Sequence, residues 1–570
     1  MSNFPWLTVA GAIPLAGALV IGLTPGRPAP AGEPGQPAPA GEASRTAAVG
    51  EPGSTAPDGE PGQPAPGGDA GRPARDLLVK RIALVFSLAT LAVTIAMAVS
   101  FKPGGPRFQF SQTYQWIPQF GVHYAVGADG IALVLIVMTA ILMPVVILAS
   151  WNDAEGAANP AGEPPPRRSV KTYFILLLVL ETMMIGVFAA TDVFLFYVFF
   201  EAMLVPMYFM IGSYGVGQRQ YAAVKFLLYS LLGGLLMLVA VIALYVYSTS
   251  GGRPGTFLFL PLTHLVLSSA AQKWLFLGFF VAFAIKAPLW PFHTWLPDAA
   301  TAAQPGAAVL LVGVLDKVGT FGMIRYCLDL FPGGSHYFTP LIIALAVIGI
   351  LYAAVVAIGQ ADLKRLIAYT SISHFGLITL GIFAMTSQGQ VGATLYMVNH
   401  GFATGALFLI AGFMIARRRS QQIADYGGVQ KVAPVLAGLF LISGLAGLAL
   451  PGLSTFVSEF LVLIGTFTRY EVPAVLATVG IILAAIYILW MYQRTMTGPV
   501  RDEVATMPDL RARELWAVGP LIALVIVLGV YPKPVIDVIN PAVHQTLVQA
   551  HSTDPAPPHP ASAVKNGSQP

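Results

Sequence analysis

Long apolar segments follow one another along almost the whole chain, and they restrict the fold more than any other feature. A helix needs about 20 mostly apolar residues to cross a bilayer. Of the 570 residues, 56% are hydrophobic and only 10% are charged, whereas soluble domains carry about 25% charged residues. The sequence therefore predicts an all-α polytopic membrane protein. The fourteen predicted helices cover residues 4–24, 78–101, 128–150, 171–190, 192–213, 221–248, 272–290, 305–330, 336–358, 365–385, 391–415, 433–468, 473–496 and 514–532.

Several classes of function are excluded by what the sequence lacks. One cysteine, Cys327, rules out an internal disulfide and an iron–sulfur cluster held by four thiolates. The sequence contains no Walker A motif, no strand-borne GxGxxG, no CxxC and no metal-ligand spacing. We therefore expect no cofactor and no metal in this chain. The net charge of +4 and the lack of a basic stripe predict no nucleic-acid partner. The N-terminus lacks a charged n-region, so we interpret it as a membrane helix rather than a cleaved signal peptide.

The positive charges orient the predicted helices. With the N-terminus outside, most lysines and arginines fall in inward loops, as the positive-inside rule expects. Both termini are then predicted on the outer side. Residues 25–75 are rich in Pro, Gly and Ala, contain GEPGQPAP twice, and are expected to be disordered. The expected divisions are a first helix at 1–24, a disordered cytoplasmic loop at 25–76, helices two and three at 77–170, two repeats at 171–330 and 331–497, a last helix at 498–540 and a disordered tail at 541–570.

Two of the predicted helices are interrupted. Pro288 and Pro291 break the seventh, and Pro451 with Gly452 breaks the twelfth. The breaks are five helices apart, an odd number, so helices four to eight and nine to thirteen are predicted to form two inverted five-helix repeats. Interrupted helices at matching positions of two halves point to a transport site.

A lysine and a glutamate lie deep in these apolar segments. Lys286 precedes the first break, and Glu201 lies in helix five. A charge at bilayer depth costs at least about 2.5–3.5 kcal/mol on insertion scales and marks an ion pathway by default. We expect the two side chains to form an ion pair that opens and closes. The alternative is a structural pair that only holds the helices together.

Further ionisable residues continue this line. A second buried lysine, Lys317, lies in helix eight, and two histidines suited to proton relay lie in helices ten and eleven. Ordinary hydrogen-bonded core histidines are an equally good interpretation. Glu459 follows the second break, where it either gates a pathway or caps exposed backbone. The candidate proton-carrying residues are Glu201, Lys286, Lys317, His374, His400 and Glu459, with Asp316, Glu181 and Asp192 as secondary candidates.

Five motifs together resemble one family of membrane proteins. They are FLFYVFFEAMLVPMYFMIG, FAIKAPLWPFHTWLPDA, DKVGTFGMIR, DLKRLIAYTSISHFG and LPGLSTFVSEF. These motifs are similar to those of the antiporter-like subunits of proton-pumping NADH:quinone oxidoreductase, respiratory complex I. The similarity runs from about Phe4 to Pro532, apart from the Pro/Gly/Ala-rich insert. Within the family the chain resembles the M-type subunits, because Glu459 stands where L- and N-type sisters usually have lysine.

The resemblance implies a role for each candidate. Glu201 is implied as the partner of Lys286, Lys317 as the central lysine and Glu459 as the terminal acid, with His374 and His400 between them. Quinone, FMN and iron–sulfur clusters are implied for other subunits, and neighbouring L-type, N-type and small membrane subunits as partners, in a bacterial inner membrane. Two departures are Ala300, where the family commonly has histidine, and Asp316, which replaces a usually apolar residue.

Other functions fit the same features. A D-type subunit of a multi-subunit sodium/proton antiporter shares the fold and motifs, and membrane-bound hydrogenases have similar subunits. A scaffold subunit whose buried charges only stabilise assembly is a third interpretation.

Overall fold

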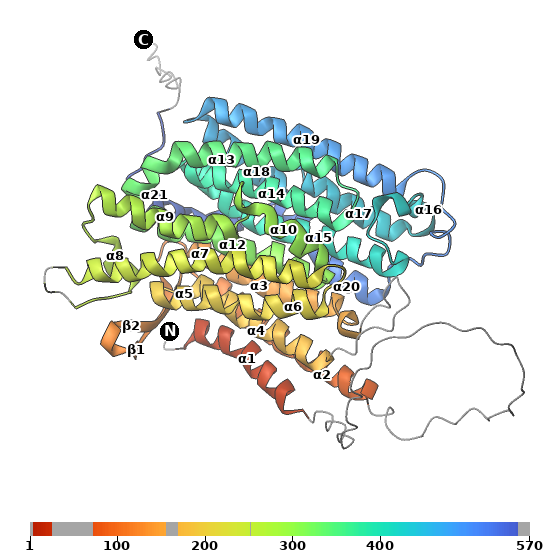
Figure 1. Cartoon of the computed structure of the whole chain (residues 1–570), viewed down its shortest axis with the longest axis horizontal. Helices are drawn as coiled ribbons and strands as arrows, with labels where there is room; N and C mark the ends of the chain where they lie inside the picture. Colours follow the sequence, from red (N-terminus) through yellow and green to blue (C-terminus); the bar gives the residue numbers. More distant parts are fainter. Residues whose placement is uncertain (1–3, 25–71, 156–168, 251, 253, 557–570) are drawn as a thin grey trace, which may run out of the picture.

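Long, nearly parallel helices make up most of the computed structural model (Figure 1). The structure describes residues 4–24, 72–155, 169–250, 252 and 254–556. Twelve of the helices in these ranges are long and apolar enough to cross a membrane, and Pro434–Gly447 and Ser454–Phe467 are shorter apolar helices. The protein is therefore an all-helical membrane protein apart from one small hairpin. The predicted disordered loop lies almost wholly outside the described residues.

The helices of the first half begin and end close to the predicted positions. They are α1 (Trp6–Leu23), α2 (Arg72–Ser100), α3 (Gly130–Ala149), α4 (Val170–Ala189), α5 (Val193–Ala202), α6 (Leu204–Tyr214), α7 (Arg219–Ser248), α8 (Phe259–Thr263), α9 (Ser269–Lys286), α10 (Trp295–Ala302), α11 (Pro305–Leu310) and α12 (Asp316–Gly322). A π-helical turn joins α11 to α12, and a second one follows α12 to Leu328.

The second half contains longer helices. They are α13 (Pro332–Ile358), α14 (Leu363–Phe383), α15 (Ser387–Arg418), α16 (Val429–Val432), α17 (Pro434–Gly447), α18 (Ser454–Phe467), α19 (Glu471–Met496), α20 (Ala512–Val530) and α21 (Lys533–Gln549). Short 3-10 turns lie at Pro118–Phe120, Asp153–Glu155, Phe292–Thr294 and Ile423–Asp425.

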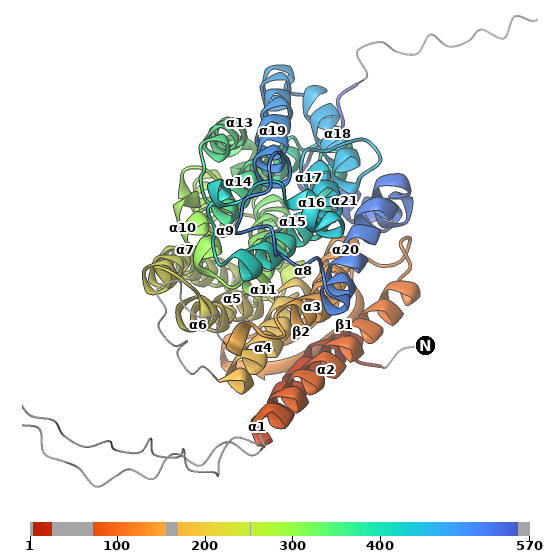
Figure 2. The ribbon, with the colours of Figure 1, turned by 90° about the vertical axis from the view of Figure 1, so that its right-hand side faces the viewer.

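The bundle has a buried centre and an apolar outer face. The span from Pro305 to Leu328 and helices α14 and α15 are buried along nearly all of their apolar length. Helices α1 and α2 lie at one edge and α19 at the opposite edge, where most of their residues are at least partly exposed (Figure 2). The polar residues of the centre are thus shielded from the surrounding apolar phase.

A β-hairpin was not predicted. Strands β1 (Gln109–Ile117) and β2 (Val122–Ala128) pair antiparallel, in a segment that the sequence analysis treated as a loop between helices two and three. Asp192 ties the hairpin to the bundle, because its carboxylate accepts a hydrogen bond from the His123 amide at 3.0 Å. The correction is local and leaves the helical fold class intact.

The predicted start of the disordered tail was also wrong. Helix α21 continues through Pro541 to Gln549, and Ile539, Ala542 and Val543 are buried against the bundle. Proline is tolerated in the first turn of a helix, because the backbone N–H that it lacks would have no helical partner there. Pro541, however, lies inside α21. Packing against α15 and α3 therefore outweighs the local preference of this residue.

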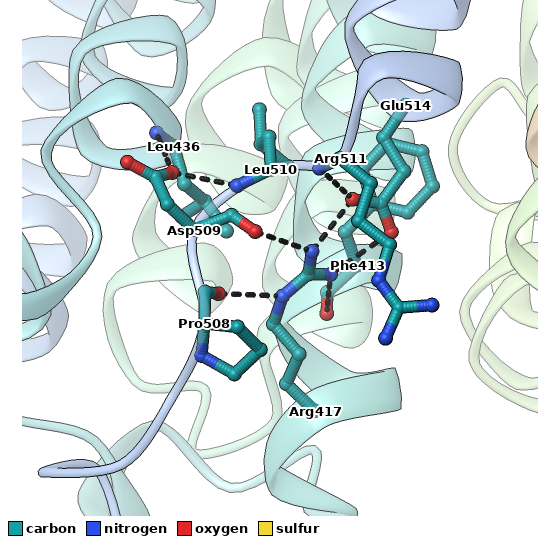
Figure 3. A network of polar contacts seen from close by, with 8 residues as sticks. All are labelled: Phe413, Arg417, Leu436, Pro508, Asp509, Leu510, Arg511 and Glu514. Atoms are coloured by element: carbon teal, nitrogen blue, oxygen red, sulfur yellow. Dashed lines mark hydrogen bonds and ion pairs between the residues drawn. The ribbon is translucent and has the colours of Figure 1, made fainter.

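One polar network fixes the end of α15 against two later segments (Figure 3). Arg417 donates to the Glu514 carboxylate at 2.6 and 3.1 Å and to the Pro508 and Asp509 carbonyls at 2.8 and 3.1 Å. Asp509 in turn accepts from the Leu436 amide at 2.9 Å and so caps α17. This network holds the first half of the second interrupted helix.

Candidate functional site

The first helix break directly follows Lys286. Helix α9 ends at this residue, and the chain becomes α-helical again only at Trp295. The Ala287 and Leu289 amides donate back into α9, and the Trp295 indole donates to the Ile285 carbonyl at 2.9 Å. Backbone groups at membrane depth need such internal partners because lipid supplies none. The break is thus stabilised by protein contacts while Lys286 stays at its tip.

Lys286 has an aromatic setting and no polar partner. Its side chain is 1% exposed, and Nζ forms no hydrogen bond among the described residues. The ammonium lies 5.1 Å from the Phe200 ring centroid and 5.8 Å from that of Phe226, within cation–π range. Glu201 follows Phe200, but its Oε1 is also unpartnered and no ion pair with Lys286 forms within 4.0 Å in the described structure.

A glycine pair on α7 brings the two groups near each other. A Cβ on Gly234 would overlap Oε1 of Glu201, and a Cβ on Gly233 would meet Ala282 of α9 at 3.0 Å. Helix α7 therefore contacts the glutamate with one glycine and the end of α9 with the other. Sequence analysis missed this pair, although two adjacent glycines inside an apolar helix signal close backbone approach.

Lys317 lies in a second polar group in the centre of the bundle. Its Nζ lies 2.6 Å from His400 Nδ1 and donates to the Val312 carbonyl at 2.5 Å. On the other side of the imidazole, His400 Nε2 lies 3.1 Å from Ser371 Oγ. The π-helical turn Leu311–Leu315 precedes the lysine, and such turns are frequent at functional sites.

His374 continues this group towards the second break. Its ring centroid lies 5.3 Å from that of His400 and 5.7 Å from that of Tyr396. Both His374 ring nitrogens lack a hydrogen-bond partner among the described residues. The Tyr396 hydroxyl donates to the Glu459 carboxylate. Each of these side chains carries a group that donates or accepts protons, and each lies beside the next one.

The second break lies beside Glu459. Helix α17 ends at Gly447 and α18 begins at Ser454, with Pro451 and Gly452 between them. The Asn399 amide donates to the Ser454 carbonyl at 2.6 Å, and the Thr455 hydroxyl donates to the Ala446 carbonyl. Protein donors thus stabilise this break as they do the first one.

The secondary candidates differ in their surroundings. Glu181 and Asp316 are fully buried, and neither carboxylate has a hydrogen-bond partner in the described part of the chain. Asp192 instead caps α5, accepting from the Phe194 and Leu195 amides at 2.9 and 3.0 Å. Ala300 is buried in α10. The geometry of Asp192 favours the structural interpretation, whereas Glu181 and Asp316 lack a structural partner.

Two polar residues, one in the line of side chains and one at the second break, were missed by the sequence analysis. Tyr396 and Asn399 look like ordinary polar residues of an apolar helix, but Tyr396 lies one turn before His400 on the same face. That spacing was the available signal. Among the described residues no group of three or more His, Cys, Asp or Glu side chains gathers in a way that would hold a metal ion.

Comparisons with known proteins identify the family. Residues 190–486 match the family model described as NADH:quinone oxidoreductase/Mrp antiporter, TM. The chain is 51% identical to NADH-quinone oxidoreductase subunit M of Mycobacterium tuberculosis, covering 99% of this chain and 98% of the relative. Subunit M of Rhodobacter capsulatus is 41% identical, over 84% of this chain and 92% of the relative.

Solved structures agree with the sequence relatives. A chain of respiratory complex I from Thermus thermophilus superposes with a TM-score of 0.75 at 32% identity, covering 84% of this chain and 97% of that one. The Mrp complex of Dietzia shares the fold, with a TM-score of 0.74 at 19% identity over 95% of this chain and 99% of that one. The chain belongs to the subunit M family of NADH-quinone oxidoreductases, the membrane-arm subunits of the proton-translocating respiratory complex I.

Proposed function

We propose that protons cross or move along this subunit through a line of buried side chains that couples to quinone reduction elsewhere in the complex. The line consists of Glu201, Lys286, Lys317, His400, His374 and Glu459. The observation that carries the proposal is the run of neighbouring side chains from Lys317 through the two histidines to Tyr396 and Glu459. Proton transfer needs groups within direct or one-water reach of each other.

The unpartnered state of Lys286 supports the same proposal. A buried charge is normally paired, yet this ammonium lies beside two aromatic rings and has no hydrogen-bond partner among the described residues. Closing the gap to Glu201 would stabilise both charges, and opening it would favour loss of the lysine proton. Alternation between these arrangements is a switch that moves a proton.

The two helix breaks support an inverted repeat. Residues 171–330 form the first proposed unit and 331–497 the second. The break after α9 and the break between α17 and α18 each fall in the fourth spanning helix of their unit, as an inverted pair requires. With fourteen crossings, both termini lie on the outer side of a bacterial cell membrane and most basic loops lie inside.

The remaining parts of the proposal concern partners. L-type, N-type and small membrane subunits flank this chain, and FMN and iron–sulfur clusters belong to other subunits, where NADH and quinone react. A D-type sodium/proton antiporter subunit is the alternative. Purification separates the two: FMN, iron–sulfur clusters and NADH:quinone activity should accompany this chain, whereas a cofactor-free complex with cation/proton exchange would reject the assignment.

Replacement of Lys286 tests the relay itself. In fully assembled complex within sealed vesicles, Lys286→Ala should lower proton pumping coupled to quinone reduction at least about tenfold, since a positioned proton carrier contributes about 10²–10⁴ in rate. Lys273→Ala is the matched control. Lys273 lies near the beginning of the same helix, where its Nζ is 3.6 Å from the centroid of the Tyr337 ring. Normal protons per electron in Lys286→Ala would leave the scaffold interpretation standing instead.

A further inference from the structure

Asp316 is a buried carboxylate that the line of proposed proton carriers does not yet include. It is fully buried, and neither of its oxygens has a hydrogen-bond partner among the described residues. Burying an unpartnered carboxyl group is costly, and no cap, ion pair or hydrogen bond explains this one. The residue therefore calls for a role other than holding the helix.

The packing of α12 shows which way Asp316 faces. Gly319 lies three residues later on the same face of the helix, and a Cβ there would lie 2.6 Å from both the Ala287 amide nitrogen and the Phe283 carbonyl oxygen. This face of α12 therefore contacts the end of α9 directly, next to Lys286. In Figure 1 the two helices run beside each other.

The neighbouring residue, Lys317, points about 100° away around the helix and faces a different element. Lys317 contacts His400, and Thr320, three residues later, donates to Met397 Sδ at 2.8 Å. This second face of α12 therefore packs on α15. Asp316 thus lies between the two lysines along the chain and in space, although no ion pair within 4.0 Å forms with either in the described structure.

We propose that Asp316 is the proton carrier between Lys286 at the first helix break and Lys317 in the centre of the bundle. This proposal rests on the relay proposed above and adds the step between its two halves. It is drawn from the two different faces of α12, one facing α9 and one facing α15, on which these adjacent residues lie.

The transfer balances in two steps. The Lys286 ammonium loses a proton and becomes a neutral amine, while the Asp316 carboxylate gains it and becomes a neutral acid. The acid then releases the proton to the neutral Lys317 amine, which becomes an ammonium as the carboxylate is restored. One positive charge thus moves from α9 to α12, and in the single intermediate between the two steps all three groups are neutral.

Neutral and acidic replacements of Asp316 test the proposal in assembled complex. Asp316→Asn keeps the shape but cannot carry a proton, and we expect it to lower coupled proton pumping at least about tenfold. Asp316→Glu keeps the acid and should retain most of the pumping. Asp329→Asn is the matched control, because Asp329 is another buried aspartate on the same stretch of chain but pairs with Arg107. The number of protons pumped per electron by Asp329→Asn should stay normal.

A spectroscopic readout separates proton carrying from structural support. The infrared difference spectrum between oxidised and reduced complex should contain a carboxylic-acid C=O band that shifts in Asp316→Glu and is lost in Asp316→Asn. A structural role alone would not move such a band.

Three outcomes would overturn the proposal. Asp316→Asn with normal pumping would do so, as would a difference spectrum unchanged in both variants. If Asp316→Asn assembles poorly, Asp316→Ser, which has a smaller side chain, is measured as the second neutral variant. If neither neutral variant assembles while Asp316→Glu does, the carboxylate is a structural group. Loss of pumping in Lys286→Ala together with normal Asp316→Asn would reject this step alone and leave the relay intact.

Discussion

Two buried ion pairs of the bundle contrast with two buried charges that have no polar partner among the described residues. Arg417 and Glu514, with side chains 8% and 9% exposed, lie 2.6 Å apart and share further hydrogen bonds (Figure 3). Arg325 and Asp129 lie 2.7 Å apart in a similar way. Lys286 and Asp316 are buried at least as deeply and have no polar partner among the described residues.

This difference separates two uses of a buried charge. A charge that holds two segments together is stabilised by a fixed partner and keeps its protonation state. A charge that must change state gains nothing from a permanent partner, because the partner would trap one form. The contrast predicts opposite effects of mutation on stability and on proton transfer at the two kinds of site.

Breaking the Arg417 pair should have the largest effect on stability. Glu514→Ala leaves a buried guanidinium without its carboxylate, which typically costs about 3–5 kcal/mol. The thermal unfolding midpoint of the assembled complex should fall, while surviving complex keeps its normal protons per electron. Unchanged thermal stability would mean that the network in Figure 3 is not a structural clamp.

Removing the charge of Lys286 should act in the opposite direction. Lys286→Met keeps an apolar chain of similar length and removes a buried group without a hydrogen bond, so stability should rise by about 1–3 kcal/mol while pumping is lost. Thermal unfolding of the assembled complex measures the gain, and Lys273→Met should show none. A loss of stability as large as in Glu514→Ala would place Lys286 among the structural charges.

The helical fold could be predicted from apolar length because each spanning helix must satisfy its own backbone groups. The hairpin at Gln109–Ala128 could not, since its strands of 9 and 7 residues are far shorter than the apolar length that marks a spanning helix. Pro541 misled the prediction of the tail, because tertiary packing decides whether a helix continues through proline. These differences come from contacts between segments that are distant in sequence.

The candidate site was predictable in type but not in connectivity. Lys286, Lys317 and Glu459 stood out because charged residues in apolar helices are rare. That Asp316 faces α9 follows from the close contact between α12 and α9 at Gly319. The spacing of residues within one helix does not show which other helix it contacts. Tyr396 drew no attention because a tyrosine in an apolar helix is ordinary until its hydroxyl has a partner.

The Tyr396 hydroxyl offers a smaller test within the central line. Tyr396→Phe removes one hydrogen bond to Glu459 and keeps the ring, so the proton step should lose about 1 kcal/mol of stabilisation, or about fivefold in rate. Pumping per electron in sealed vesicles measures the effect. Tyr492→Phe is the control, because Tyr492 is a partly exposed tyrosine of α19 stacked on Phe440. Equal effects in the two variants would remove Tyr396 from the line.

An exposed pair near the Arg417 network sets the lower end of the comparison. Glu503 is 60% exposed and its carboxylate lies 3.8 Å from Arg418. Solvent screens such pairs, so Glu503→Ala should change stability by only about 0.2–1 kcal/mol and should leave pumping unchanged. Thermal unfolding measured beside Glu514→Ala compares two glutamates that differ chiefly in burial. If both variants lost the same stability, burial would not be what distinguishes the paired charges, and the reasoning that separates them from Lys286 and Asp316 would fail with it.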